Sequence, residues 1–405
     1  LIAGVDLGTT KTCAVIAEVP QDPILRREIN ILGVGQARTV GMQEVITHID
    51  ETTESIKNAL AEAELMAGAE VDRVYVGVRG DNIQAMMSPG IVAVQGDEIS
   101  RHDIERVHEV ARAVAFPPDR ELIHAIPQEY VVDGQRGIKD PLGMMGTRLE
   151  AELYLVTVSA LAAENIRRSV HRAGYQVEDL ILEPLAAARS VLTVDEKEVG
   201  VALVEIGDAT TNIAAYVDGE IRHLAVLPLG GHTVTNDLVQ GLSIPFVEAK
   251  KTKELFGIAC SQLVDPKEMI ELPGLVGGQT RQVARELIAH VIEARMDELL
   301  VMTRAELQRE GLLSKLNAGI VLSGGASALQ GVNRLAQQVF AAPVRNGSPG
   351  EELAGIADSV ARPKFSTAVG LVLSGFDRYK ETGFGSSSLS SGLIGKMRKW
   401  LREFF

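Results

Sequence analysis

The chain has 405 residues, of which 46% are hydrophobic and 23% charged, a composition typical of globular proteins with room for two or more domains. Its net charge of -14 argues against nucleic acid as the main partner, because phosphate backbones attract basic surfaces. No run of eighteen apolar residues occurs, so no segment is predicted to span a membrane. The two cysteines, Cys13 and Cys260, do not suggest a disulfide framework, and this indicates a reducing compartment.

The opening stretch, Ile2 to Val19, is predicted to form a strand, a tight turn and a second strand. The first strand ends near Asp6, and the turn contains Gly8, Thr9, Thr10 and Lys11. Glycine lets the backbone approach a ligand closely, and the hydroxyls and the lysine supply donors and positive charge for a phosphate. Asp6 would repel a phosphate unless a divalent cation lay between the two. An ordinary hairpin with a polar turn is the alternative.

A pattern of strands followed by helices continues after this hairpin, which is typical of a helix-covered sheet. The predicted elements are strand Ile31–Val40, helix Ile46–Met66 and strand Val71–Val78. The stretch Ile83 to Leu149 differs, because it combines short predicted strands (Gly90–Val94, Gln128–Val132) with a charged helix, Arg101–Val114, and we interpret it as a small inserted α+β subdomain. Strand Leu149–Val158, helix Leu161–Ala173 and strand Val177–Leu182 follow, and a helix then opens with Glu183 and Pro184.

The stretch Val199 to Val217 repeats the theme of the first hairpin. A strand runs into Glu205, and the turn contains Gly207, Asp208, Thr210 and Thr211. The shared order of carboxylate, glycine and hydroxyl indicates an internal duplication. Two such hairpins facing each other across a cleft would grip one polyphosphate from both sides.

Two glycine pairs add to this prediction. Gly230 and Gly231 precede a predicted helix, Val234–Gly241, whose N-terminus is suited to a phosphate. Gly324, Gly325 and Ala326 follow strand Ile320–Leu322, where a flat ring or a sugar could pack directly on the backbone. The remaining predicted helices are Pro245–Gly257, Gln279–Glu310 and Leu335–Phe340, and Thr367–Leu373 closes the folded part.

The end of the chain has a composition of its own. Residues from Glu381 to Gly392 are rich in glycine and serine and are predicted to be a flexible tether. The last thirteen residues have one apolar face (Leu393, Ile394, Met397, Trp400, Leu401, Phe404, Phe405) and a basic remainder (Lys396, Arg398, Lys399, Arg402). This pattern predicts an amphipathic helix that lies on an anionic membrane surface. A helix that docks back on the domain and a peptide that binds a partner are the alternatives.

Taken together, these motifs resemble the actin-like ATPase family, which includes actin, Hsp70 and the sugar kinases. The two hairpin turns resemble that family's phosphate loops, Ser323–Ala326 its adenosine motif, and Glu183–Ala187 and Ala368–Gly370 its two connecting helices. Within the superfamily the chain is most similar to the bacterial cell-division family FtsA, because Ile126–Tyr130, Gly137–Met144 and the amphipathic tail resemble segments of that family. The resemblance covers essentially the whole chain.

The resemblance implies an α/β, actin-like two-lobed fold with duplicated mixed sheets flanked by helices, plus the inserted α+β subdomain. The implied core of lobe 1 comprises residues 1–80, 159–198 and 363–380, with residues 81–158 inserted. The implied core of lobe 2 comprises 199–240 and 313–362, with an outer subdomain at 241–312. A flexible linker at 381–391 and the membrane-targeting helix at 392–405 complete this division.

The resemblance also implies ATP and Mg²⁺ as cofactors and at most slow ATP hydrolysis. Asp6, Glu183 and Glu205 would act in hydrolysis, with Asp6 and Glu205 holding Mg²⁺ through water. The residues implied in nucleotide binding are Gly8, Thr9, Thr10, Lys11, Gly207, Asp208, Thr210, Thr211, Gly230, Gly231, Lys250, Lys253, Gly324, Gly325 and Ala326. The sequence departs from the superfamily pattern at Glu205, where aspartate is usual, and at Lys250, where a ribose-binding glutamate is common. Lys11 also lies closer to Asp6 than the phosphate-binding lysine of actin does.

The implied function is bacterial cell division. The protein would polymerise on the inner face of the cytoplasmic membrane at the division site and help to recruit other divisome membrane proteins. Its outer subdomain, with Arg295 and Arg304, would bind the C-terminal peptide of the tubulin-like protein FtsZ. A pilus-assembly actin homologue and a sugar or carboxylate kinase of the same fold are the alternatives. A chaperone is not expected, since no peptide-binding domain follows residue 380.

Overall fold

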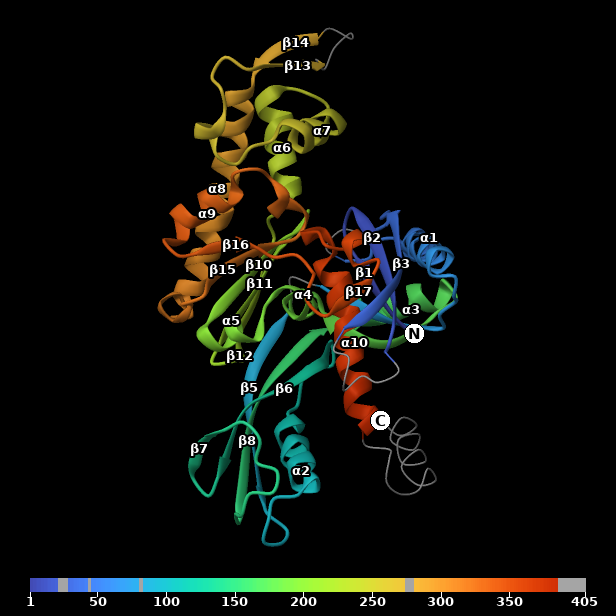
Figure 1. Cartoon of the computed structure of the whole chain (residues 1–405), viewed down its shortest axis with the longest axis vertical. Coiled ribbons are helices and arrows are strands. Elements are labelled where there is room, and N and C mark those ends of the chain that lie inside the picture. Colours follow the sequence, from blue (N-terminus) through green and yellow to red (C-terminus); the bar gives the residue numbers. More distant parts are fainter. Residues whose placement is uncertain (21–27, 43–44, 80–82, 274–279, 385–405) are drawn as a thin grey trace.

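The computed structural model describes residues 1–20, 28–42, 45–79, 83–273 and 280–384. The molecule is elongated: two lobes lie side by side near its middle, with a hairpin-tipped helical part at one end and an antiparallel sheet at the other (Figure 1). The predicted membrane helix 392–405 and linker residues 385–391 lie outside the described residues. Linker residues 381–384 instead continue helix α10 (Ser366–Phe384), so the predicted start of the tether was wrong by four residues.

The first lobe is built on a mixed sheet whose strand order is β17-β3-β2-β1-β4-β9. β1 pairs antiparallel with β2 and parallel with β4, so the chain makes a hairpin and then crosses over. All six residues of β1 are buried, because helices cover both faces of the sheet. The strands are β1 Ile2–Leu7, β2 Lys11–Glu18, β3 Ile29–Arg38, β4 Arg73–Val78, β9 Gln176–Leu182 and β17 Leu353–Gly355.

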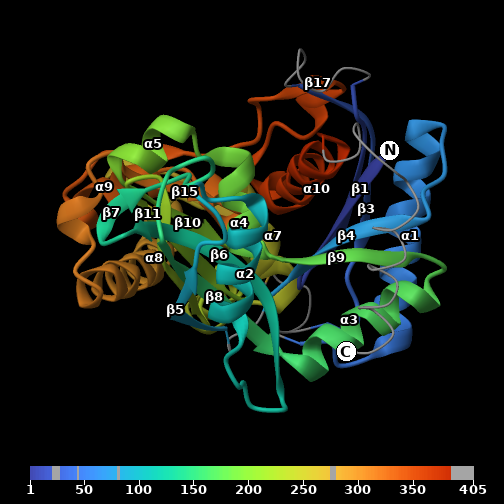
Figure 2. The ribbon, with the colours of Figure 1, turned by 90° about the horizontal axis from the view of Figure 1, so that it is seen from below.

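Helices cover the two faces of this sheet (Figure 2). α1 packs on β2 and β3, whereas α10 packs on the other side of β1. The alternation along β1 follows from strand geometry: Val5 joins the core of α1, and Ile2 joins the core of α10 with Phe376. The helices of this lobe are α1 Ile49–Ala67, α3 Ala160–Arg172, α4 Glu183–Val191 and α10 Ser366–Phe384.

The second lobe repeats this topology, with the strand order β12-β11-β10-β15-β16. β10 pairs antiparallel with β11 and parallel with β15, as β1 does with β2 and β4. The duplicated mixed sheets predicted from the two hairpins are therefore confirmed. The strands are β10 Val201–Ile206, β11 Thr211–Val217, β12 Glu220–Leu227, β15 Gly319–Ser323 and β16 Val344–Asn346.

Apolar residues on one side of β10 join the core made by the helices of the second lobe, whereas Val201 and Leu203 face α4. The helices of this lobe are α5 Val194–Val199, α6 Gly231–Leu242, α7 Phe246–Phe256, α8 Arg285–Arg309 and α9 Val332–Phe340. The predicted helix Gln279–Glu310 was wrong at its start. Residues Thr280–Ala284 form strand β14, which pairs with β13 (Met269–Pro273), and the long helix α8 begins at Arg285.

The inserted subdomain is an antiparallel sheet of order β5-β8-β6-β7 with α2 on one face. Its elements are β5 Gln84–Ala93, α2 Arg101–Arg112, β6 Arg120–Val132, β7 Gln135–Ile138 and β8 Arg148–Ser159. The prediction of short strands Gly90–Val94 and Gln128–Val132 was wrong, since β5 has 10 residues and β6 has 13. Register shifts near Leu122 and Pro127 interrupt the alternation along β6, which explains why its pattern indicates a shorter strand.

Helices α4 and α10 cross where the two lobes meet. The backbone of Gly370 on α10 approaches α4 so closely that an added Cβ would lie 1.7 Å from the carbonyl oxygen of Ala186. At the start of α10 the Ser366 carbonyl accepts a hydrogen bond from Ser190 of α4, 2.7 Å away. Glycine at position 370 therefore allows the close crossing that joins the two sheets.

Candidate functional site

A cleft of about 530 Å³ opens between the lobes and is lined by both hairpin turns and by the Gly324-Gly325 turn. This volume is typical of small-molecule sites. The structure brings sixteen of the predicted site residues to the cleft: Asp6, Gly8, Thr9, Thr10, Lys11, Glu183, Glu205, Gly207, Asp208, Thr210, Gly231, Lys250, Lys253, Gly324, Gly325 and Ala326.

Two residues predicted to bind the cofactor do not line this cleft. Thr211 is fully buried, and its hydroxyl donates to the carbonyl of Leu229 at 2.8 Å. Gly230 packs against the second turn, where a Cβ would lie 2.5 Å from the carbonyl oxygen of Asp208. Both residues support the second hairpin. Thr211 joins it to the segment after β12, and Gly230 allows the start of α6 to pack against it.

The two hairpin turns are built alike. Leu7 pairs with Thr12 at the end of the first hairpin, and Ile206 pairs with Thr211 at the end of the second. In the second turn the amide of Gly207 donates to the Thr210 carbonyl at 2.8 Å. Within the described residues, the amides of Thr9 and Thr10 and those of the turn residues 208–210 donate to no other residue. Amides left free on both sides of a cleft are suited to the oxygens of a polyphosphate.

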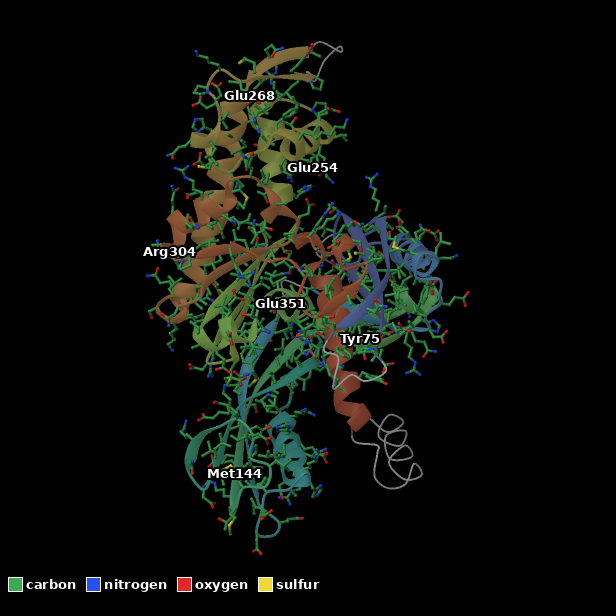
Figure 3. The ribbon with its side chains drawn as sticks, in the orientation of Figure 1. Tyr75, Met144, Glu254, Glu268, Arg304 and Glu351 are labelled. Carbon is green, nitrogen blue, oxygen red and sulfur yellow. The ribbon has the colours of Figure 1, made fainter. Side chains whose placement is uncertain are left out.

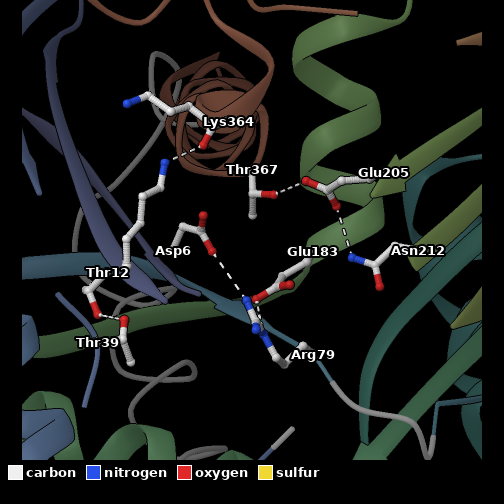
Figure 4. A network of polar contacts seen from close by, with 10 residues as sticks. Asp6, Thr12, Thr39, Arg79, Glu183, Glu205, Asn212, Lys364 and Thr367 are labelled. Carbon is white, nitrogen blue, oxygen red and sulfur yellow. Dashed lines mark hydrogen bonds and ion pairs between the residues drawn. The ribbon is translucent and has the colours of Figure 1, made fainter. Parts of the chain in front are cut away.

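An arginine that the sequence analysis missed occupies the middle of the carboxylate cluster. Arg79 follows β4, and its Nε donates to Glu183 Oε1 at 3.0 Å. Its Nη2 lies 3.8 Å from Asp6 Oδ1, so the guanidinium lies between the two carboxylates (Figure 4). The side chain of Arg79 is only 11% exposed, which strengthens both interactions. In the sequence Arg79 is a single arginine at the end of a predicted strand. Its partner Glu183 is 104 residues away along the chain, so the sequence does not indicate the pair.

Burial changes the proton affinities of this cluster. It raises the pKa of Glu183 to about 8, because Arg79 offsets only part of the desolvation while Asp6 and Glu205 add repulsion. Burial also raises the pKa of Asp6 despite the charges of Arg79 and Lys11. The cluster therefore holds more carboxylates than Arg79 alone neutralises, and a further cation would stabilise their charged forms.

Glu205 is held from two sides (Figure 4). The hydroxyl of Thr367, the second residue of α10, donates to its Oε1 at 2.6 Å, and the Asn212 amide donates to its Oε2 at 3.0 Å. Burial raises the pKa of Glu205, while these two hydrogen bonds lower it. The side chain of Glu205, which is longer than the aspartate usual at this position, is thus held by Asn212 of β11 and Thr367 of α10.

Two lysines line the cleft beside the turns, Lys11 in the first turn and Lys253 against the start of α6. Lys11 Nζ donates to the carbonyl of Lys364 at 2.7 Å and lies 4.6 Å from the centroid of the Phe365 ring. Lys253 Nζ donates to Gly231 at 2.6 Å, and burial lowers the pKa of Lys253. The prediction that the start of α6 faces a phosphate was wrong for its first amides, since those of Gly231 and His232 donate to carbonyls of the second turn.

The Gly324-Gly325 turn gives the cleft a backbone floor beside the second hairpin turn. Gly324 has a φ of 82°, and a Cβ there would lie 2.5 Å from the carbonyl oxygen of Ile206. A Cβ on Gly325 would meet no atom within 4 Å, so this residue borders open space. Further lining residues that the sequence analysis did not single out include Asn212, Glu254, Leu255, Arg285, Leu329, Lys364 and Thr367. They come from segments that only the fold brings together.

The predicted partner-binding arginines lie on α8 but do not form one patch. They are nine residues apart, which places them on opposite sides of a helix. Arg295 is engaged by Asp237 of α6, with Nη2 and Oδ1 3.0 Å apart. Arg304 is exposed on the flank of the second lobe that faces away from the first lobe (Figure 3).

The residues of the cleft fit a magnesium nucleotide. Asp6 and Glu205 offer carboxylate oxygens, the ligand atoms that Mg²⁺ prefers. Free amides and two lysines lie near them, and the Gly324-Gly325 floor leaves room for a flat group. Outside the cleft, His223, Glu306 and Glu310 have ligand-type atoms within 4.8 Å of one another, but Arg309 pairs with both glutamates.

Two family models match the chain. The model described as "Cell division protein FtsA" matches residues 202–370, which include the second hairpin and the Gly324-Gly325 turn. The model described as "SHS2 domain inserted in FTSA" matches residues 80–157. That range coincides closely with the antiparallel sheet β5–β8 and helix α2.

Full-length relatives are similar over the whole chain. The cell division protein FtsA of Pseudomonas aeruginosa is 39% identical over 414 residues, which cover 100% of this chain and 98% of the relative. FtsA of Neisseria meningitidis is 37% identical, and FtsA of Escherichia coli is 35% identical, each with 100% of this chain and 98% of the relative covered.

Solved structures share the fold at low identity. A PilM–PilN type IV pilus biogenesis complex has a TM-score of 0.64 at 16% identity, covering 93% of this chain and 98% of that one. MreB5 of Spiroplasma citri bound to ADP has a TM-score of 0.52 at 13% identity, with 94% and 96% covered. These likenesses confirm the predicted actin-like fold, and the sequence relatives establish the family. The chain belongs to the FtsA family of bacterial cell-division proteins.

Proposed function

We propose that the cleft binds ATP with Mg²⁺ and that the bound nucleotide sets the shape of a membrane-attached filament subunit. The observation that carries this proposal is the placement of two matching turns with free amides on opposite sides of one cleft, beside a backbone floor. A nucleotide that contacts both turns would bridge the lobes and favour one relative orientation.

Each group of residues has a chemical role in this proposal. The amides and hydroxyls of the two turns bind phosphate oxygens, and Gly324 to Ala326 support the adenosine. Asp6 and Glu205 hold Mg²⁺ through water, and Mg²⁺ when bound neutralises phosphate charge. Lys250 and Lys253, which line the cleft, would contact the sugar and the phosphates. Glu183, held by Arg79, is the group that would orient an attacking water.

We expect the nucleotide to act as a conformational switch with at most slow hydrolysis. Glu183 is occupied by Arg79 in the ion pair, and burial raises its pKa to about 8, so a proton competes with water activation at neutral pH. A steady-state phosphate-release assay tests this expectation. Turnover faster than about one per second, the low end of typical enzyme rates, would contradict it.

The cleft is tested by filling it. A Cβ on Gly325 meets no atom within 4 Å, so Gly325→Leu would extend a side chain from the floor into the cleft. We expect ATP affinity measured by calorimetry to fall at least about tenfold, which is about 1.4 kcal/mol. Gly350→Leu is the matched control, because its Cβ also meets nothing within 4 Å and it does not line the cleft. If the two variants bind ATP with equal affinity, the proposal that nucleotide binds in this cleft is wrong.

Membrane attachment is a second part of the proposed function. The amphipathic segment from Leu393 to Phe405 would bury its apolar face in the inner face of the cytoplasmic membrane, at about 1.5–3 kcal/mol for each fully buried side chain. Ordering the helix offsets much of this gain, so one tail would bind reversibly. Tails aligned on a filament would bind through avidity. No described helix is long and apolar enough to cross a bilayer.

Vesicle co-sedimentation tests this attachment. The intact chain should sediment with vesicles that contain anionic lipid, whereas a chain ending at Phe384 should stay in the supernatant. Ending at Phe384 keeps all of α10, so this truncation leaves the described fold intact. A Trp400→Glu variant of the intact chain should behave like the truncated chain. If the intact chain stays in the supernatant, the tail is not a membrane anchor.

The partners follow from the family. We propose that the outer subdomain at residues 241–312 binds the C-terminal peptide of FtsZ, and that the filament recruits other divisome membrane proteins through the inserted subdomain. Since Arg295 is engaged by Asp237 and Arg304 is exposed, we expect Arg304→Glu to weaken peptide binding without loss of stability. Arg295→Glu should weaken both, because it leaves Asp237 beside a like charge. Unchanged binding in both variants would place the peptide elsewhere.

A pilus-assembly role is the alternative that one comparison favours, because the fold also matches the PilM–PilN complex. A homologue of that kind would not depend on a membrane-binding tail. The vesicle experiment therefore separates the two proposals.

A further inference from the structure

The carboxylate cluster of the cleft lies close to the inserted subdomain, both along the chain and through one hydrogen bond to β6. Arg79 comes immediately after β4, where the chain leaves the first-lobe sheet, and β5 of the inserted subdomain begins at Gln84. The arginine that pairs with Glu183 and lies near Asp6 is thus also at the entrance to the insertion.

A second connection reaches the insertion from the same cluster. His124 lies on β6, and its Nε2 accepts a hydrogen bond from the backbone amide of Leu182 at 2.9 Å. Leu182 is the residue before Glu183, which opens α4. The ring is partly buried and desolvation lowers its pKa to about 4, so the neutral form accepts this bond. The side chain of Glu183 therefore contacts Arg79, while the backbone amide of the preceding residue, Leu182, is hydrogen-bonded to His124 of β6.

Close packing makes these connections stiff. Gly77, two residues before Arg79 on β4, lies so near Glu183 that an added Cβ would be 3.1 Å from its Cγ. The end of β4 and the start of α4 thus have little room to move independently. Asp6 and Glu183 are 8% and 3% exposed, so a change of charge between them is weakly screened.

We propose that Arg79 is a positioning residue that couples occupancy of the cleft to the orientation of the inserted subdomain. With a divalent cation held at Asp6, the contact of the guanidinium with Asp6, already long at 3.8 Å, would be disfavoured. Arg79 would then pair with Glu183 alone and shift the start of α4, and the Leu182–His124 hydrogen bond would carry this movement to β6. This inference rests on the proposed binding of magnesium nucleotide.

The experiment is a distance measurement between two spin labels on the full chain, made with and without Mg²⁺ and a non-hydrolysable ATP analogue. Labels at His102→Cys on α2 and Leu65→Cys on α1 report the insertion against the first lobe, because both positions are exposed. The native Cys13 and Cys260 are buried, so the labels react at the introduced sites. Nucleotide affinity is measured on the same samples.

We expect the wild-type chain to change its distance distribution on binding nucleotide. Arg79→Lys keeps a charge but cannot contact two carboxylates with one planar group, and Arg79→Gln removes the charge. Both should lose most of the change at nucleotide concentrations that saturate each variant, and His124→Phe should reduce it. Arg73→Gln is the control, since Arg73 lies on β4, the strand that leads to Arg79, in an exposed pair with Glu178 and should keep the full change.

The outcomes separate the two proposals. If the wild type binds no nucleotide, the proposed function fails. If it binds nucleotide without a distance change, or if either folded Arg79 variant keeps the full change, only the coupling is overturned. A loss of the change in Arg73→Gln would also overturn it, because the effect would then follow from any alteration of β4.

Discussion

At the scale of single residues, the site is a set of buried charges whose partners come from distant parts of the chain. Asp6 and Glu205 could be predicted because each ends a strand before a glycine-containing turn. Arg79 and Thr367 could not, because a lone arginine after a strand and a threonine at a helix start are common in any sequence. Their roles depend on where Glu183 and Glu205 lie after folding.

His124 gives a prediction for pH dependence. Its pKa is lowered to about 4, chiefly by burial, whereas an unfolded histidine titrates near 6.5. Between pH 6.5 and 4 the unfolded chain therefore binds a proton that the folded chain does not, and stability falls as the pH is lowered. We expect His124→Gln to remove this loss, which is up to about 1.4 kcal/mol for each pH unit.

Urea unfolding at pH 5 and pH 7 measures the difference. The free energy of unfolding should fall more for the wild type than for His124→Gln when the pH is lowered. His102→Gln is the control, because His102 is exposed on α2 and should leave the pH dependence of the wild type unchanged. Identical pH dependence in the wild type and His124→Gln would mean that His124 is not kept neutral by burial.

At the scale of elements, the predicted bounds of strands and helices were accurate where the hydrophobic periodicity and the residues that end an element were both clear. The strands of both hairpins and helices such as α2 and α3 lie within a few residues of their predicted bounds. The β13–β14 hairpin was not predicted, because its two strands pair only with each other within the described residues. In addition, the polar pattern of Thr280–Ala284 continues into α8 without a break. β6 was cut short because register shifts at Leu122 and Pro127 interrupt its alternation.

The crossing of α4 and α10 gives a prediction at this scale. Gly370→Ala would place a methyl group 1.7 Å from a backbone oxygen of α4, and backbone cannot turn aside as a side chain can. We expect a loss of about 1–3 kcal/mol in the free energy of unfolding, as for other overpacked interiors. Chemical denaturation measures this loss.

Ser374→Ala is the matched control on the same helix, where the side chain is half-buried. It should change the free energy of unfolding by much less than Gly370→Ala does. If Gly370→Ala is as stable as the control, the helices have room to separate and the crossing does not fix the lobes.

At the scale of the whole molecule, two repeated sheets enclose one cleft, and α10 joins that cleft to the end of the chain. Thr367 at the start of α10 contacts Glu205, and the helix continues to Phe384, after which the predicted membrane segment follows. The repetition could be predicted because the two hairpins share a pattern. The shape of the cleft could not be predicted from this repetition, since that shape depends on how α4 and α10 pack between the sheets.

The most direct test of this account is a structure of the full chain with Mg²⁺ and a non-hydrolysable ATP analogue. We predict that the phosphates lie between the turns at Gly8–Lys11 and Gly207–Thr210, with the base on Gly324 to Ala326 and the cation near Asp6 and Glu205. A cleft left empty at saturating nucleotide, or a nucleotide bound outside the space between the two turns, would contradict the account.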